Sequence, residues 1–151
     1  MKKSKRFEPI QEIASTSAKG LARAMGDAAR KVAELERQLE QLQSYRDEYV
    51  RKSAQGAGAI DAVKLQNYRM FLDRLGEAVR QHLRNLDAAR TEYEKRRALW
   101  SEKRVEAESL NRVVERFRTD ERHAADRREQ REGDDAAMRV SLAAQGEAGN
   151  R

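Results

Sequence analysis

The chain has 151 residues, of which 38% are charged, 38% hydrophobic and only 5% aromatic, and its formal net charge is +6. This is too little apolar surface for a globular core of ordinary shape, whereas long helices need only two or three apolar residues in every seven. Because cysteine is absent, disulfides and thiolate metal sites are excluded. No stretch approaches the roughly 20 apolar residues of a membrane-spanning helix, and no apolar run follows the basic start as in a secretory signal. We therefore expect a soluble, cytoplasmic protein that is either helical or disordered.

The first half of the chain carries apolar residues at alternating steps of three and four. The series is Ala14, Ala18, Leu21, Met25, Ala28, Val32, Leu35, Leu39, Leu42, Arg46 and Tyr49. Every member except Arg46 is apolar, which is the pattern of one coiled-coil face and argues against disorder. Pro9 suits the first turn of a helix, where its missing N–H has no intrahelical partner. The pattern predicts a helix from about residue 9 to about residue 52.

A glycine-rich stretch, SAQGAGAI at residues 53–60, interrupts the pattern. Gly56 and Gly58 permit a reversal of the chain, and Asp61 can cap a following helix. The same spacing then runs without a slip from Leu65 to Ala124, which predicts a second helix from about residue 61 to about residue 131 and a left-handed supercoil. The non-apolar members of this second series are His82, Arg96, Lys103 and Glu121.

Two helices with matching seams predict an all-α fold, a long antiparallel two-helix coiled-coil hairpin over residues 1–132 in which the second helix is the longer. With the turn centred near Ala57, opposed seam residues have numbers that sum to about 114, as in Leu39 with Leu75. In this register the first helix ends near Phe7, and the second helix beyond about Leu110 has no partner. We therefore expect an unpaired apolar stripe there, which either frays in isolation or binds another protein. The pattern ends before Gly133, so residues 133–151 are predicted to be a flexible tail.

Positive charge gathers at the end of the predicted hairpin that lies away from the turn. Lys2, Lys3, Lys5 and Arg6 lie there, and residues 104–131 hold eight arginines against seven carboxylates. An electropositive end suits an acidic protein ring or pore, or a phosphate backbone, although the mixed charges of the second helix alone are typical of a solvated surface.

No catalytic or metal-binding motif is present. HExxH, GxxxxGK and GxGxxG are absent, and His82 and His123 lie far apart. Two helices side by side offer no water-excluding pocket. We therefore expect no enzymatic activity, no cofactor, no metal site and no small-molecule substrate.

Aromatic residues flank the seam near the turn. Tyr45 and Phe71 both fall at heptad position g, and the two g edges of an antiparallel pair lie on the same side. We expect the two rings to meet, either as an exposed ridge or folded over the seam as a shield. An exposed aromatic ridge on a rigid edge is typical of a protein-binding hot spot.

Several short segments follow one another in a distinctive order. They are F-x-x-I at Phe7, LERQLEQLQSYRDEY, the glycine-containing turn, NYRMFLDRLGEAVRQ and YEKRRALW. Over roughly residues 7–125 the chain resembles the FliJ family of the bacterial flagellar type III export apparatus. The resemblance implies a non-enzymatic coiled-coil stalk that assists export of flagellar substrates. It also implies a place at the flagellar base, peripherally associated with the cytoplasmic face of the inner membrane.

The resemblance also implies partners and contact residues. The partners are the hexameric export ATPase (FliI), its regulator (FliH), the export gate protein (FlhA) and the chaperones of flagellar substrates. The implied gate-binding residues are Gln38, Leu42, Tyr45, Tyr49, Phe71, Leu75, Ala78 and His82. Binding to the ATPase ring is expected at the basic end, on Lys2, Lys3, Lys5, Arg6, Leu110, Arg112, Val114, Arg116 and Phe117.

Three alternatives stay open at this point. The stalk protein of a virulence type III secretion system would share the architecture. A nucleic-acid-binding coiled coil fits the basic end, but the charges alternate in sign and no aromatic-basic motif appears, so we expect no nucleic acid partner. A structural homodimer is the third alternative.

Overall fold

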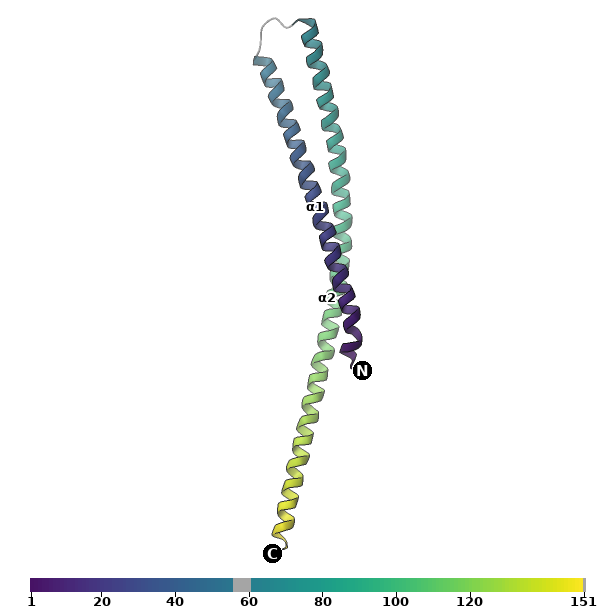
Figure 1. Ribbon diagram of the computed structural model, residues 1–151, viewed down its shortest axis with the longest axis vertical. Coiled ribbons are helices and arrows are strands. Elements are labelled where there is room, and N and C mark those ends of the chain that lie inside the picture. The colour runs from purple at the N-terminus through teal and green to yellow at the C-terminus, as the bar shows by residue number, and fades with distance from the viewer. Residues whose placement is uncertain (56–60, 151) are drawn as a thin grey trace. The chain divides into compact units, whose positions relative to one another are not determined.

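The structure is a computed structural model that describes residues 1–55 and 61–150. Two helices make up nearly all of these residues: α1 spans Lys3–Gln55 and α2 spans Ala62–Ala148 (Figure 1). The helices run antiparallel, because Tyr49 near the end of α1 stacks on Tyr68 near the start of α2, whereas Glu36 pairs with Arg90. The predicted all-α hairpin with a longer second helix is confirmed.

Each helix contributes to two compact units. Unit 1 comprises Met1–Thr16 and Arg104–Arg151, and unit 2 comprises Ser17–Lys103. The sequence predicted a single hairpin over residues 1–132 and gave no sign of this division. In a pair of helices each residue packs only against its near neighbours on the two helices, because such a pair has no sheet or third layer. The contacts along the seam can therefore fall into two separate units.

The helix α1 begins earlier than predicted. It starts at Lys3, and Pro9 lies inside it rather than at its first turn. Pro9 has no N–H for the carbonyl of Lys5 four residues earlier, which costs the helix one hydrogen bond. Contacts with α2 offset this loss: the ring centroids of Phe7 and Phe117 lie 5.3 Å apart, and Arg118 Nη2 donates to Glu8 Oε1 at 3.0 Å.

The start of α2 agrees with the sequence, and its end does not. Asp61 caps the helix as predicted, because its Oδ1 accepts a hydrogen bond from the Lys64 N–H at 2.8 Å. The predicted end near residue 131 is too early, since the helix continues to Ala148. Residues 136–145 are mostly Ala, Met, Arg, Leu and Gln, which favour helix even where the apolar seam has ended. The flexibility of residues 133–151 stays a prediction. Of the turn predicted at about residues 53–60, residues 53–55 belong instead to α1, and residues 56–60 lie outside the described residues.

The predicted seam is the buried face of both helices. All members of the first series are buried or half-buried, as are all members of the second except Leu65, which is 38% exposed. In unit 2 the core is formed by Leu39, Val79 and Leu86, packed against Val32, Leu35 and Leu42. In unit 1 it is formed by Ala14, Ala107 and Val114.

The predicted register is wrong. The numbers of facing residues sum to 117 for Tyr49 with Tyr68 and to 124 for Phe7 with Phe117, rather than to about 114 along the whole pair. The helix bounds account for the first of these values only, because α1 ends at Gln55 and α2 begins at Ala62, whose numbers also sum to 117.

The change of register also removes the predicted overhang. The expected partner of Phe7 was Ala107, but Phe7 contacts Phe117. The same three-and-four spacing extends back from Ala14 through Gln11 and Phe7 to Ser4, and Ser4 is buried. Leu110 is half-buried and Val114 is only 1% exposed. The predicted stripe residues Leu110, Val114 and Phe117 are therefore packed inside unit 1 and are not left unpaired.

Candidate protein-binding surfaces

The aromatic residues of unit 2 form one cluster of four rings. Tyr45 and Phe71 meet edge to face with centroids 6.3 Å apart, Tyr49 lies 4.4 Å from Phe71, and Tyr49 stacks on Tyr68 at 5.5 Å. Tyr45 is 52% exposed, whereas the other three rings are half-buried. Both expectations are thus met in part, because Phe71 and Tyr49 cover the seam while Tyr45 stands on the surface. Tyr68 belongs to this aromatic cluster, although the sequence placed it only in the seam.

The other predicted gate-binding residues differ in exposure. Gln38 is exposed, and its Nε2 donates to Glu34 Oε1 at 3.2 Å. Leu42 and Ala78 are half-buried, and Leu75 is only 8% exposed. Leu75 therefore lies beneath the predicted gate-binding surface. The most accessible members of this surface are Gln38 and Tyr45. Their role in binding stays a prediction.

His82 lies in the seam, as its spacing predicted. It is half-buried, and its Nδ1 atom is fully covered with no hydrogen-bond partner among the described residues. A buried polar atom without a partner destabilises the fold.

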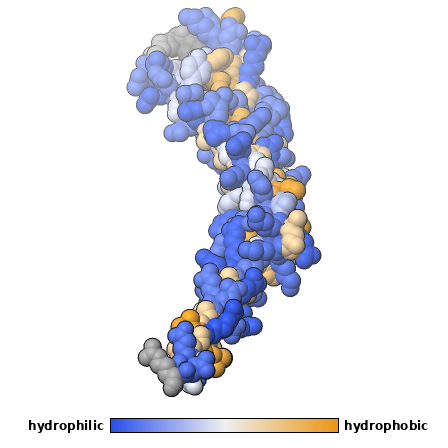
Figure 2. Space-filling model, turned by 60° about the horizontal axis from the view of Figure 1, so that its bottom comes forward, coloured by the Kyte–Doolittle hydropathy of each residue, from blue (hydrophilic) through white to orange (hydrophobic). Residues whose placement is uncertain are grey.

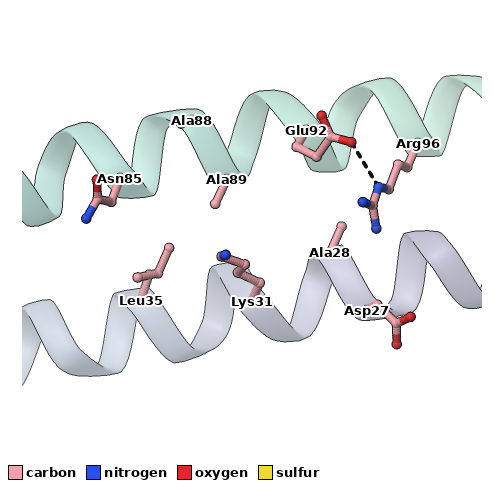
Figure 3. Close-up of a pocket in the computed structure, with 9 residues that line it drawn as sticks. All are labelled: Asp27, Ala28, Lys31, Leu35, Asn85, Ala88, Ala89, Glu92 and Arg96. Carbon is pink, nitrogen blue, oxygen red and sulfur yellow. Dashed lines mark hydrogen bonds and ion pairs between the residues drawn. The ribbon is translucent and has the colours of Figure 1, made fainter.

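An open groove of about 650 Å³ lies along unit 2 (Figure 3). Seam residues Ala28 and Ala89 point toward the opposite helix from the two sides of this groove, and both side chains are too short to fill the space between the helices. The full lining is Asp27, Ala28, Lys31, Leu35, Asn85, Ala88, Ala89, Glu92 and Arg96. The sequence predicted no pocket, because the coincidence of two alanines depends on the register.

Arg96 closes one end of the groove. Its Nε donates to Glu92 Oε1 and its Nη1 donates to the main-chain carbonyl of Ala24, both at 3.0 Å. This seam arginine, which broke the apolar series, therefore joins α2 to the backbone of α1.

The two edges of the helix pair carry different chemistry. Ion pairs join heptad e positions of the two helices, between Arg90 and Glu36 at 3.1 Å in unit 2 and between Arg118 and Glu8 at 3.0 Å in unit 1. The g positions of unit 2 include Tyr45 and Phe71 of the aromatic cluster and Lys31, Asn85 and Glu92 of the groove. We call these two sides the e edge and the g edge. Figure 2 shows a mostly hydrophilic face with smaller hydrophobic patches between the charged residues.

The cations predicted to bind the ATPase ring are exposed in unit 1. Lys2, Lys3, Lys5, Arg6, Arg112 and Arg116 all lie on the surface. Lys3 Nζ sits 5.7 Å from the centre of the Phe117 ring, which is a cation–π arrangement. Leu110, Val114 and Phe117, the apolar residues assigned to the same site, pack within the unit, and the binding role of the whole set stays a prediction.

A carboxylate of α2 holds the start of α1. The Ser4 N–H donates to Glu121 Oε1 at 3.1 Å and the Ser4 hydroxyl donates to Glu121 Oε2 at 2.7 Å. These hydrogen bonds, first the one from the hydroxyl and then the one from the backbone, lower the pKa of Glu121. The hydrogen bonds that Arg118 donates to Glu8 and then to Glu115 raise its pKa. Ser4 is not among the predicted site residues, because the predicted first helix starts only at Pro9, although the seam spacing reaches Ser4.

Within residues 1–55 and 61–150 no group of acidic and histidine side chains is arranged to hold a metal ion. Neither helix, over its described length, has a stretch apolar enough to cross a membrane.

Comparison with known proteins decides the family. The model of the flagellar FliJ protein family matches residues 2–146. The chain belongs to the FliJ family. This FliJ-family chain is 25% identical to the flagellar FliJ protein of Escherichia coli (strain K12) over 134 residues, which are 88% of this chain and 91% of that protein. No solved structure matches it.

Membership confirms the resemblance seen in the sequence and extends it. The match runs to residue 146, whereas the recognised segments ended near residue 125. As a FliJ-family protein the chain is a component of the flagellar export apparatus, which links it to protein transport, flagellum biogenesis and motility. The family is non-catalytic, and the flagellar system is favoured over a virulence secretion system.

Proposed function

We propose that this FliJ-family protein is a non-enzymatic stalk that binds the export gate through the g edge of unit 2 and the export ATPase ring through the cations of unit 1. The single observation that carries the proposal is the aromatic cluster, in which Tyr45 is 52% exposed beside three half-buried rings. A tyrosine held by neighbouring rings loses little conformational freedom on binding, which is typical of hot-spot residues.

The e edge, which lies opposite the aromatic cluster, supports the assignment of the gate contact to the g edge. The Arg90–Glu36 ion pair spans the e edge of unit 2 and covers the seam at that point, although Leu83 is exposed on the same edge. On the g edge the aromatic cluster and the alanine groove leave apolar surface accessible. A partner that buries apolar area gains more on the g edge than on the e edge.

The cations of unit 1 support the second contact. Lys2, Lys3, Lys5 and Arg6 contribute +4 of the chain's net charge of +6. A concentration of charge at one place speeds association with an acidic surface and orients the encounter. Contacts with the ATPase regulator and with substrate chaperones, and a place at the cytoplasmic face of the inner membrane, belong to the same proposal.

The variant Tyr45→Ala tests the gate contact. We expect the affinity for the purified cytoplasmic part of the export gate protein to fall roughly thirtyfold, as for a central hot-spot tyrosine. Calorimetric titration measures the affinity, and thermal unfolding followed by circular dichroism measures the stability.

The matched control is Leu83→Ala on the e edge. Leu83 is 44% exposed, so its removal deletes a similarly accessible apolar side chain from the opposite side of unit 2. We expect this variant to bind the gate like the wild type. Equal losses for the two variants, or a fall in Tm that accounts for the loss in Tyr45→Ala, would remove the g edge from the proposal.

A further inference from the structure

The start of α1 is unfavourable as an isolated helix end. The first N–H groups of a helix have no intrahelical partners, and the helix dipole places positive charge at this end. Lys3, Lys5 and Arg6 nevertheless lie in the first turn, Lys2 precedes it, and no acidic residue of α1 lies there to compensate. The local sequence therefore favours fraying at the position where the helix begins.

Glu121 supplies from α2 what the first turn of α1 lacks. Its carboxylate accepts one hydrogen bond from the Ser4 N–H at 3.1 Å and another from the Ser4 hydroxyl at 2.7 Å. One carboxylate thus satisfies a free backbone donor and places a negative charge beside the positive helix end. Ser4, which is 4% exposed, is the buried centre of this contact. We call the Ser4–Glu121 pair the clasp.

Neighbouring contacts keep the clasp in place. The ring of Phe117, one turn before Glu121, contacts Phe7 at 5.3 Å and lies beneath Lys3 Nζ. Arg118 binds Glu8 on the next turn of α1. The charged groups that act on the Glu121 carboxylate are Lys2 from the N-terminal residues and Arg118 from α2, and both favour its ionised form.

We propose that Glu121 is a positioning residue for ring binding, whose carboxylate fixes the first turn of α1 and so presents Lys2, Lys3, Lys5 and Arg6 as one ordered array to the export ATPase. The last step rests on the proposed function, whereas the clasp itself does not. Without the clasp the cations would lie on a frayed segment, and binding would have to order that segment at a cost in affinity.

Amide hydrogen exchange of the free chain tests the clasp without any partner. In Glu121→Gln we expect the amides of Ser4 and Arg6 to exchange about tenfold faster than in the wild type. The Ser4 N–H loses a hydrogen bond to a charged group, and the first turn, in which the Arg6 N–H donates to the Lys2 carbonyl, then frays. The control is Asp120→Asn, which removes the same charge from the exposed neighbouring residue and should exchange like the wild type.

The pH dependence of the exchange difference distinguishes an effect of the ionised Glu121 carboxylate from an effect of side-chain packing. The pKa of Glu121 is lowered in the fold, so its contribution is present above the unfolded pKa and is lost as pH falls through the folded pKa. The difference between wild type and Glu121→Gln should therefore disappear at low pH. Equal exchange in the two proteins at neutral pH, or a difference that persists at low pH, would overturn the clasp.

Binding to the purified ATPase tests the positioning role, because loss of a negative charge and loss of order in the first turn should change the affinity in opposite directions. Removing a negative charge beside the cations should strengthen attraction to an acidic ring, and Asp120→Asn should bind as well as the wild type or better. We expect Glu121→Gln instead to bind several-fold more weakly. If exchange quickens but affinity does not fall, Glu121 does not position the cations. A wild-type chain that fails to bind the ATPase overturns the ring contact and the positioning role together, whereas the exchange result stands by itself.

Discussion

At the scale of single residues, burial on the seam separates side chains that are neighbours in sequence. Val114 is 1% exposed in unit 1, whereas Val113 beside it is 38% exposed. The seam spacing distinguishes the two correctly, because Val114 is a member of the series and Val113 is not. The sequence did not show what covers Val114, since that depended on a first helix starting at Lys3 and on the register.

Truncation of the two valines measures this difference. We expect Val114→Ala to lower the free energy of unfolding by about 2 kcal/mol, because it leaves a cavity in the core of unit 1. Val113→Ala should cost less than about 0.5 kcal/mol, since its side chain is already partly in water. Urea titration followed by circular dichroism measures both values. Similar small losses for the two variants would mean that α1 does not cover the 110–117 segment in solution.

His82 gives a second prediction at the residue scale. Because its Nδ1 atom is buried without a partner among the described residues, replacement by leucine should raise the free energy of unfolding by about 1–2 kcal/mol. The exposed His123 is the control, and His123→Leu should leave stability unchanged. Thermal melts at neutral pH report both. A destabilised His82→Leu would show that the imidazole has a favourable partner in solution.

At the scale of elements, the sequence was most informative about the seam and least informative about where helices end and meet. The three-and-four spacing depends only on the helical period, so it identified the buried face and the cap at Asp61. Proline suits the first turn of a helix, but it also occurs further inside a helix where tertiary contacts outweigh one lost hydrogen bond, as Pro9 does in α1. The groove and the clasp depend on which residues of α1 and α2 face each other, and the numbers of facing residues do not keep one sum along the pair.

The end of α2 leads to a prediction about stability. Residues 125–150 are all exposed, so this part of the helix buries no seam. A solitary helix of this length is marginal in water, and its loss removes helical signal without removing core contacts. We expect a chain that ends after Glu132 to show less helicity but a Tm within about 2 °C of the full chain. A larger fall in Tm would show that residues 133–148 pack on the rest of the protein.

At the scale of the whole molecule, charge and apolar surface are assigned to different units. The N-terminal cations belong to unit 1, and the aromatic cluster and the groove belong to unit 2. The family resemblance predicted both contact sets, but only the structure shows which of their members are exposed. One chain with two separate surfaces can serve two partners of a single export machine.

The ring contact should depend on salt. Replacing Lys2 and Lys5 by glutamine should lower the affinity for the ATPase about tenfold at 0.1 M salt, and the loss should shrink as salt rises, because exposed charges are screened. The matched control replaces Lys19 and Arg23, two exposed cations of unit 2. Fluorescence titration over a salt series measures the effect. Equal losses for the two double variants would indicate a response to net charge alone.

The most direct test of the central claim is whether one population of the chain binds both partners at once. Sedimentation of the purified chain with the export ATPase and the cytoplasmic part of the gate protein measures this. The account predicts a complex that contains all three proteins, from which Tyr45→Ala removes only the gate protein. Displacement of the ATPase when the gate protein is added would contradict it, because the two partners would then compete for one surface.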